Sequence, residues 1–401
     1  MKISIKRGTK EIGGSAVEII SDKGQRIIVD LGLPLDAVDI SSELLPDIKG
    51  LTHKSDDLLA LLISHAHQDH YGLGKYIDDK IPVYLSYEAQ SIMQIAHIHR
   101  LPGAFVFPNT VCFENEKTFQ LNDFRITPYL FDHSAYGAYG FLIEVDGQKV
   151  FYSGDFRAHG RKRKLFYKFL RNHPQNIDVL LLEGSCLGRE NSEHYEYEED
   201  LENKFYDFWK DSKGLALVQT SAQNIDRIVT IYRASKKCRR NIVLSGYAGH
   251  ILQGTGNPRL PNFTWPDVKK FSLHPLKRHE TGVNELMLNP QQYVVLLDSK
   301  IYEQLKNAGI INNQTTYVYS MWKGYKEKYQ NQLTFLADNN IPMQDIHTSG
   351  HADVPTLKKI VAGLKPKIII PIHTFYPQKF MQMFDNVVCL NDGDLFEIPI
   401  K

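Results

Sequence analysis

The feature that most constrains this chain is a cluster of metal-binding side chains directly after an apolar run. The run 59–63 predicts a buried strand, and His65, His67, Asp69 and His70 follow it within six residues. Side chains two apart in extended backbone point the same way, so His65 and His67 can bind one ion. Asp69 and His70 fall where the chain bends and can reach a second ion. Imidazoles with a carboxylate suit zinc or a similar metal. The alternative is a solvated loop that is rich in histidine.

Two later apolar runs end in residues of the same kind. His133 comes directly after the stretch 126–132, and Asp155 comes directly after the stretch 150–154. Loops at strand ends are where open α/β layers place ligands. We therefore expect His133 and Asp155 to complete the set that His65 begins.

Three further polar residues repeat this scheme. The apolar run 177–182 is followed by Glu183, for which a capped strand end is the alternative reading. His351 precedes a predicted helix over 355–364, and His373 ends a predicted strand that begins at 367. One helix and one strand separate the two histidines, so both can emerge on the same edge of a sheet.

Bulk composition sets limits on partners and compartment. The 401 residues carry a net charge of +1, so nucleic-acid binding would need a local basic groove. The run Arg161–Lys164 could supply charge there, although a solvated face is the alternative. The four cysteines are far apart and form no Cys-x-x-Cys, which argues against disulfides and zinc knuckles. No signal peptide or membrane span is apparent, so we expect a cytoplasmic enzyme without membrane contact.

The remaining chain reads as alternating strands and helices, and the fold class is α/β. The predicted elements are strands at 2–6 (edge-like), 16–20 and 25–30, a helix at 86–100, the start of a solvated helix within 193–202, a strand–turn–helix unit at 214–232, and strand–helix pairs at 292–308 and 316–336. The histidines of the first helix, His97 and His99, are assigned to its surface or to positions behind the metal-binding residues. The character of the chain changes near 190, so we expect domains at 1–189 with 341–401 and an inserted α/β domain at 190–340.

A helix start within the insert is a candidate phosphate site. Thr220, Ser221, Ala222 and Gln223 lie where the helix of the strand–turn–helix unit is expected to begin. Free backbone N–H groups at a helix N-terminus attract phosphate. An ordinary helix cap is the alternative.

The metal-binding cluster resembles the signature of the metallo-β-lactamase fold superfamily, and His67 in place of glutamate separates it from the flavodiiron branch. Glu183, His351 and His373 resemble motifs of the β-CASP family, most closely the ribonuclease J group. The resemblance implies an αββα sandwich with an inserted β-CASP domain. It also places Asp30 beside the metal-loop histidines, for which a loop cap is the alternative, and makes Asp155 a bridge between two metal ions.

The resemblance further implies the site residues and their chemistry. Two zinc ions, with manganese as an in vitro substitute, would be held by His65, His67, Asp69, His70, His133, Asp155 and His373. Catalysis would involve His351, Asp69 and Glu183, with His351 protonating the leaving oxygen or holding a phosphate oxygen. Substrate phosphates would contact Ser221, Ala222, Gln223, His347, Thr348, Ser349, Gly350 and His351.

The implied activity is metal-dependent hydrolysis of single-stranded RNA. The enzyme would act as a 5′→3′ exonuclease and would also have endonuclease activity. A hydrolase of a small lactone, thioester or nucleotide is the alternative, and a binding protein with an inactive site is a third. Single-stranded DNA would need the same phosphate contacts. The chain departs from the family at His373-Thr374-Phe375, where His-Gly-Glu is frequent. It also stops at Lys401, without the C-terminal domain that assists dimerisation, so monomer and dimer both stay open.

Overall fold

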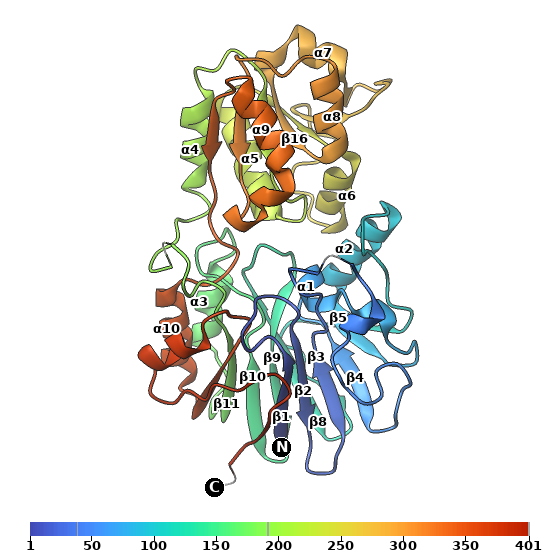
Figure 1. Cartoon of the computed structure of the whole chain (residues 1–401), viewed down its shortest axis with the longest axis vertical. Coiled ribbons are helices and arrows are strands. Elements are labelled where there is room, and N and C mark those ends of the chain that lie inside the picture. Colours follow the sequence, from blue (N-terminus) through green and yellow to red (C-terminus); the bar gives the residue numbers. More distant parts are fainter. Residues whose placement is uncertain (38, 191, 400–401) are drawn as a thin grey trace. The chain divides into compact units, whose positions relative to one another are not determined.

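The computed structural model describes residues 1–37, 39–190 and 192–399, and the chain forms two compact units (Figure 1). The first unit contains residues 1–195 and 350–401, and the second contains residues 196–349. The second unit is therefore an insertion between two segments of the first. It begins and ends later than the insert expected at 190–340.

Within the described residues, the first unit contains two sheets. One has the strand order β20-β1-β2-β3-β4-β5-β6, and the other has the order β19-β11-β10-β9-β8-β7. The strands of the first sheet are β1 (Lys2–Arg7), β2 (Ala16–Ile20), β3 (Arg26–Val29), β4 (Leu58–Leu62), β5 (Val83–Ser86), β6 (Thr110–Phe113) and β20 (Leu395–Glu397). Those of the second are β7 (Phe119–Leu121), β8 (Phe124–Phe131), β9 (Ala138–Val145), β10 (Gln148–Tyr152), β11 (Val179–Glu183) and β19 (Ile368–Ile372).

The second sheet is buried on both faces, which explains its continuous apolar strands. In β11, Val179 and Leu181 join the core between the two sheets, whereas Leu180 and Leu182 join a second cluster. Successive side chains of a strand point to opposite faces, so one apolar run serves both clusters. The second cluster includes Phe166 and residues of the helix that follows His351.

Helices cover the outer faces of these sheets, which gives the αββα arrangement expected for the fold class. The helices are α1 (Gln68–Tyr71), α2 (Tyr87–Ile98), α3 (Lys164–Arg171) and α10 (Val354–Leu364), with 3₁₀ turns at Ser42–Leu44, Gly74–Tyr76 and Pro377–Gln382. Figure 1 shows α3 and α10 side by side next to β11. Helix α2 begins after Ser86, whose hydroxyl caps it by accepting from the Ala89 N–H.

The second unit is built on one sheet with the strand order β15-β14-β13-β16-β12-β17-β18, whose described pairs are all parallel. Its strands are β12 (Ala216–Gln219), β13 (Asn241–Leu244), β14 (Val268–Phe271), β15 (Glu280–Thr281), β16 (Tyr293–Leu297), β17 (Thr316–Tyr319) and β18 (Met343–Asp345). Its helices are α4 (Leu201–Trp209), α5 (Ile225–Lys237), α6 (Gly246–Gly254), α7 (Val283–Leu288), α8 (Ser299–Asn307) and α9 (Gln330–Asp338), with 3₁₀ turns at Pro290–Gln292 and Lys323–Tyr329.

One expectation from the sequence needs correction. Strand β1 is not at an edge, because β20 pairs with it as Lys2 opposite Glu397. Helix α4 begins at Leu201, inside the stretch 193–202 where the sequence places a helix start, and Glu198 just before it forms a buried ion pair with Arg227. Residues 341–349 lie in the second unit, where β18 pairs with β17.

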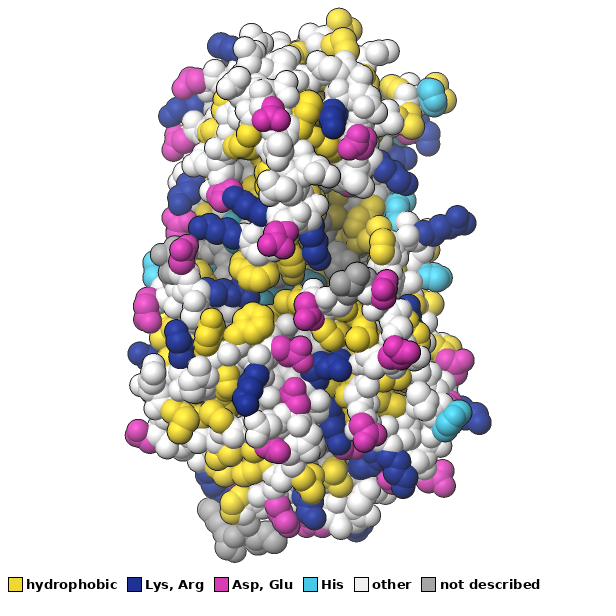
Figure 2. Space-filling model, viewed as in Figure 1, with side chains coloured by type: hydrophobic (Ala, Val, Ile, Leu, Met, Phe, Trp, Pro, Cys, Tyr) yellow, Lys and Arg dark blue, Asp and Glu magenta, His cyan; other side chains and the backbone are white. Residues whose placement is uncertain are grey.

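Other global features agree with the composition. All four cysteines are free. On the face drawn in Figure 2, Lys and Arg side chains are interspersed with Asp and Glu, in keeping with the small net charge. Across the part of the chain that the structure describes, no helix is both long enough and apolar enough to cross a membrane.

The core between the two sheets predicts a large difference between two Leu→Ala substitutions in the first unit. Leu181→Ala removes a fully buried side chain and should lower the free energy of unfolding by about 2–5 kcal/mol. Leu395→Ala, at a side chain 58% exposed on β20, should change it by less than about 0.5 kcal/mol. Urea denaturation measures both, and equal effects would contradict this description of the core.

Candidate metal centre

Five strand ends bring polar side chains to one place in the first unit. His65 and His67 follow β4, His133 follows β8, and Asp155 follows β10. Strands β11 and β19 pair in parallel, and their last residues, Glu183 and Ile372, lie opposite each other. His373 is the residue directly after β19. Because these ends neighbour one another, residues distant in sequence become close in space.

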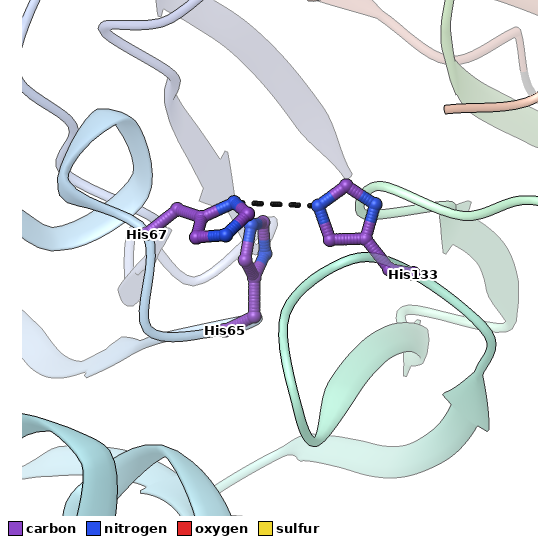
Figure 3. A group of neighbouring side chains, drawn as sticks. All are labelled: His65, His67 and His133. Carbon is purple, nitrogen blue, oxygen red and sulfur yellow. Dashed lines mark hydrogen bonds between the residues drawn. The ribbon is translucent and has the colours of Figure 1, made fainter. Parts of the chain in front are cut away.

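Three imidazoles form one part of the centre (Figure 3). The ligand-type atoms of His65, His67 and His133 lie within 4.8 Å of one another. His133 Nε2 is 3.3 Å from His67 Nδ1, and the His65 ring points to the same space. Three nitrogens at these separations can bind one tetrahedral ion and leave a position for water or substrate.

The other part combines carboxylates with histidines. Asp69, His70 and His373 form a second group of possible ligands, and His373 Nε2 is 3.4 Å from Asp69 Oδ2. Asp155 lies between the two groups. Its Oδ2 is 3.2 Å from His70 Nε2 and 3.8 Å from both His65 Nε2 and His133 Nε2.

The site has the chemistry of an ion-binding pocket. Among the described residues, His65 Nε2 and Asp155 Oδ1 are buried and have no hydrogen-bond partner. A buried polar atom without a partner is costly, and a bound cation would satisfy both atoms. Imidazole and carboxylate are zinc ligands, so the residues present fit that metal.

The pKa directions keep most of these groups in ligand form. Burial lowers the pKa of His65 and of His133 well below the usual range, so both rings are neutral with a lone pair available. For Asp155, burial acts in the opposite direction, but His373 and His70 outweigh it and lower the pKa of this carboxyl. The pKa of His70 is raised despite burial, because it lies beside Asp155 and Asp30.

Asp30 orients His70 from behind. Asp30 Oδ2 lies 2.7 Å from His70 Nδ1 and accepts from the Tyr152 hydroxyl at 2.6 Å and the Ser64 hydroxyl at 2.7 Å. The Ser64 N–H donates to Asp30 Oδ1 at 2.7 Å. The resulting carboxylate–histidine pair leaves His70 Nε2 to face Asp155, an arrangement that typically orients metal-bound histidine.

His373 is held in the same manner by partners that the sequence did not indicate. The Ser185 hydroxyl lies 2.7 Å from His373 Nδ1, and the His373 N–H donates to the Gly8 carbonyl at 2.7 Å. The backbone of His373 has a φ of 51°, a left-handed conformation that costs free energy in a non-glycine residue. These contacts stabilise the conformation that turns its Nε2 toward Asp69.

Glycine is required where the metal loop packs closely. A Cβ on Gly32 would collide with the carbonyl oxygen of Asp69. The N–H of Leu33 donates to the Gln68 carbonyl at 2.9 Å, so the two backbones run in direct contact here. Helix α1, which carries Asp69 and His70, is therefore fixed by the segment after β3.

Glu183 and His351 form a pair beside these possible metal ligands. His351 Nδ1 is 3.2 Å from Glu183 Oε2 and 3.6 Å from Asp155 Oδ2. Glu183 also accepts from the backbone N–H groups of Phe156 and Ser185, both at 3.2 Å. Although burial opposes it, Glu183 and Asp155 raise the pKa of His351, so this ring favours the protonated form.

The expected phosphate-contacting residues are divided between the units. Gly350 and His351 lie in the first unit, whereas Ser221, Ala222, Gln223, His347, Thr348 and Ser349 lie in the second. Helix α5 begins at Ile225 with Asn224 as its cap, so the expected helix start at Thr220–Gln223 is in fact the preceding turn. The side chains of Thr348 and Ser349 are buried.

Two other predicted groups have different surroundings. His97 and His99 on or next to α2 belong to none of the ligand groups found among the described residues. Lys162, in the basic run before α3, lies 3.8 Å from the buried Asp132 carboxylate and is half-buried.

Family comparisons agree with this geometry. Residues 27–202 match the family described as "Beta-lactamase superfamily domain", and residues 340–379 match "Zn-dependent metallo-hydrolase RNA specificity domain". A solved structure from Enterococcus faecalis, titled as a protein of unknown function, superposes with a TM-score of 0.80 at 21% identity. The match covers 98% of this chain and 99% of that one, so the two proteins share a fold.

Curated relatives carry the name ribonuclease J. The Mycoplasma pneumoniae protein is 24% identical over 96% of this chain and 70% of its own length. The Helicobacter pylori protein is 22% identical over 99% of this chain and 61% of its own length. The chain thus spans about two thirds of these relatives.

The fold and the site define a metallo-β-lactamase-fold, zinc-dependent hydrolase. Within that superfamily the chain is similar to the ribonuclease J proteins, and it carries a segment that matches an RNA specificity domain of zinc-dependent metallo-hydrolases.

The contacts of Asp30 predict a loss of metal affinity in Asp30→Asn. An amide is a weaker acceptor for His70 and offers one oxygen in place of two, so zinc affinity should fall on the order of 10- to 100-fold. Competition with a chromophoric chelator measures this. Asp57→Asn is the control, because Asp57 pairs with Arg26 away from the site. Unchanged zinc affinity in Asp30→Asn would show that Asp30 does not orient a ligand.

Proposed function

We propose that the chain is a two-zinc ribonuclease that hydrolyses the phosphodiester bonds of single-stranded RNA. The observation that carries this is the convergence of buried imidazoles and carboxylates beside the His351–Glu183 pair. His65, His67 and His133 would hold one zinc, Asp69, His70 and His373 would hold the other, and Asp155 lies between the two groups. Manganese can replace zinc in vitro, since the donors are imidazoles and carboxylates.

The chain's own residues then divide the chemistry. At this site, bound zinc would supply a more acidic water and would stabilise negative charge on the phosphate. His351 faces the leaving oxygen and donates a proton to it, for which its raised pKa is suited. Glu183 orients His351 through the contact to Nδ1. Asp69 contributes to catalysis through its contacts to His70 and His373.

Substrate selection is proposed on the family resemblance. The turn Ser221–Gln223 and the segment His347–Gly350 bind nucleotide phosphates, and backbone N–H groups do so where side chains are buried. The enzyme acts 5′→3′ from a monophosphate end and has endonuclease activity besides. A cytoplasmic location and a monomeric or dimeric state stay predictions of the sequence.

A labelled-substrate assay tests the activity. We would incubate the zinc-loaded protein with 5′-labelled single-stranded RNA and DNA of one sequence, carrying monophosphate, triphosphate or hydroxyl ends. Mononucleotide release from monophosphate RNA is expected, and it should be lost in His65→Ala. Internal cuts independent of the end would indicate an endonuclease with the same chemistry. If zinc-loaded protein cleaves no polymer, the proposal is wrong and a small-molecule hydrolase takes its place.

His351→Ala should lower kcat by about 10²- to 10⁴-fold, because a positioned acid is removed, while RNA affinity changes little. Single-turnover cleavage and equilibrium RNA binding separate the two effects. His97→Ala is a matched control at an exposed histidine of α2. Loss of RNA binding with unchanged cleavage of bound RNA would contradict the assignment of His351 as the acid.

A further inference from the structure

A fully buried ion pair in the first unit joins the loop that carries His133 to the loop that carries Asp155. Arg157 Nε donates to Asp132 Oδ1 at 3.2 Å, and both side chains are 0% exposed. The backbone N–H of Arg157 also donates to the Asp132 carbonyl at 2.7 Å, and the two residues form an isolated antiparallel bridge. A backbone link and a side-chain link therefore connect the same two residues.

The strands that lead to these two loops do not pair with each other. In the order β10-β9-β8, strand β9 lies between them. The pairing of β9 with β8 ends at Phe131, and its pairing with β10 ends at Tyr152, so both ladders stop before the loops begin. The Asp132–Arg157 pair thus supplies a direct link between the loops past the ends of the strands.

Each member of the pair is close in sequence to a possible metal ligand. Asp132 immediately precedes His133, and Arg157 follows Asp155 by two residues. His133 Nε2 and Asp155 Oδ2 lie 3.8 Å apart. Stability alone gives little reason for such a pair, because apolar side chains of similar volume often stabilise a core as well as a buried ion pair does. The placement of the two neighbouring ligands does give a reason.

A glycine leaves the space that the pair occupies. A Cβ on Gly160 would collide with Arg157 Nε and with both carboxylate oxygens of Asp132. Gly160 is not among the residues with positive φ, so glycine is required here for space and not for backbone conformation. The backbone at this position therefore packs directly on the ion pair, and a side chain would displace it.

We propose that Asp132 and Arg157 are positioning residues that set the separation of His133 and Asp155 in the metal centre. The bridge and the ion pair hold the two loops in one relative placement, and the Gly350 carbonyl, 2.6 Å from His133 Nδ1, then directs the ring. Neither Asp132 nor Arg157 contacts substrate, because both side chains are fully buried. The inference rests on the metal centre of the proposed function and adds two residues outside the ligand set.

The test compares two buried arginines of the first unit. Arg157→Lys keeps the charge but places a methylene where the Nε–H donates to Asp132. Arg26→Lys is the matched control, because Arg26 Nε likewise donates to a carboxylate, that of Asp57, at 2.9 Å. Arg26 begins β3, whereas Asp30 and the metal centre lie past the other end of that strand.

Three measurements are made without RNA: urea unfolding, zinc affinity by chelator competition, and the visible absorption of the cobalt-substituted protein, which depends on ligand number and geometry. Both variants should lower the urea midpoint, because each loses a buried hydrogen bond. Only Arg157→Lys should weaken zinc binding, by about tenfold or more, and change the cobalt spectrum. Equal zinc affinities in the two variants, or a wild-type cobalt spectrum in Arg157→Lys, would overturn the proposal.

Gly160→Ala keeps the proposal testable if Arg157→Lys does not fold. The added methyl group collides with the ion pair itself, so zinc binding should weaken in the same direction. Gly363→Ala in α10 is its control, because the nearest atom to a Cβ there is the end of the Leu170 side chain, which can move. Wild-type zinc affinity in Gly160→Ala would overturn the proposal.

Failure of this inference and failure of the proposed function give different results. If the wild-type protein binds no zinc, the metal centre and this inference both fail. If it binds zinc but cleaves no RNA, only the proposed activity fails. If the wild-type protein cleaves RNA and Arg157→Lys binds zinc with unchanged affinity, only this inference fails.

Discussion

The burial of ionisable groups at neighbouring strand ends of two sheets is the constraint on which the first unit depends. Asp155, His65, His70 and His133 are at most 2% exposed. The apolar core between the two sheets brings their strand ends together, and it also withdraws these groups from water. Charges in such a place need compensation. Contacts between imidazoles and carboxylates compensate part of the charge. His65 Nε2 and Asp155 Oδ1 have no hydrogen-bond partner, and a bound cation would compensate these two atoms.

Around this cluster lies a second layer of hydrogen bonds that gives each ring its direction. Asp30 faces His70, Ser185 faces His373, and the Gly350 carbonyl faces His133. Asp30 and His373 both have left-handed backbone, with φ of 58° and 51°. A strained backbone conformation persists where several surrounding contacts hold it in place, as the hydrogen bonds of Asp30 and His373 do here. The same contacts therefore orient the rings of His70, His373 and His133 and hold the strained backbone in place.

The sequence predicted that His65, His67, Asp69 and His70 lie close together, because their spacing is local and these residue types are rare in combination. It also predicted β11, β12 and α5, whose apolar patterns match buried elements. It did not indicate Ser185 or the Gly350 carbonyl as partners, because a hydroxyl or a backbone oxygen has no distinctive pattern.

Near the two ends of the insert, local sequence patterns do not show which residues are buried or paired. All three residues of β18 are exposed, so nothing in Met343–Asp345 reads as a buried strand. The acidic stretch before α4 reads as a solvated helix, yet Glu198 is fully buried against Arg227. A partner distant in sequence decided both outcomes, and no local pattern could show it.

The order of the ligands along the chain has a consequence for synthesis. His65, His67, Asp69 and His70 are made early, whereas His373 follows the whole second unit. On the ribosome, the nascent chain would hold the first imidazoles long before the last one exists. The complete centre can therefore bind metal, and the protein can become an active hydrolase, only after the inserted unit has been translated.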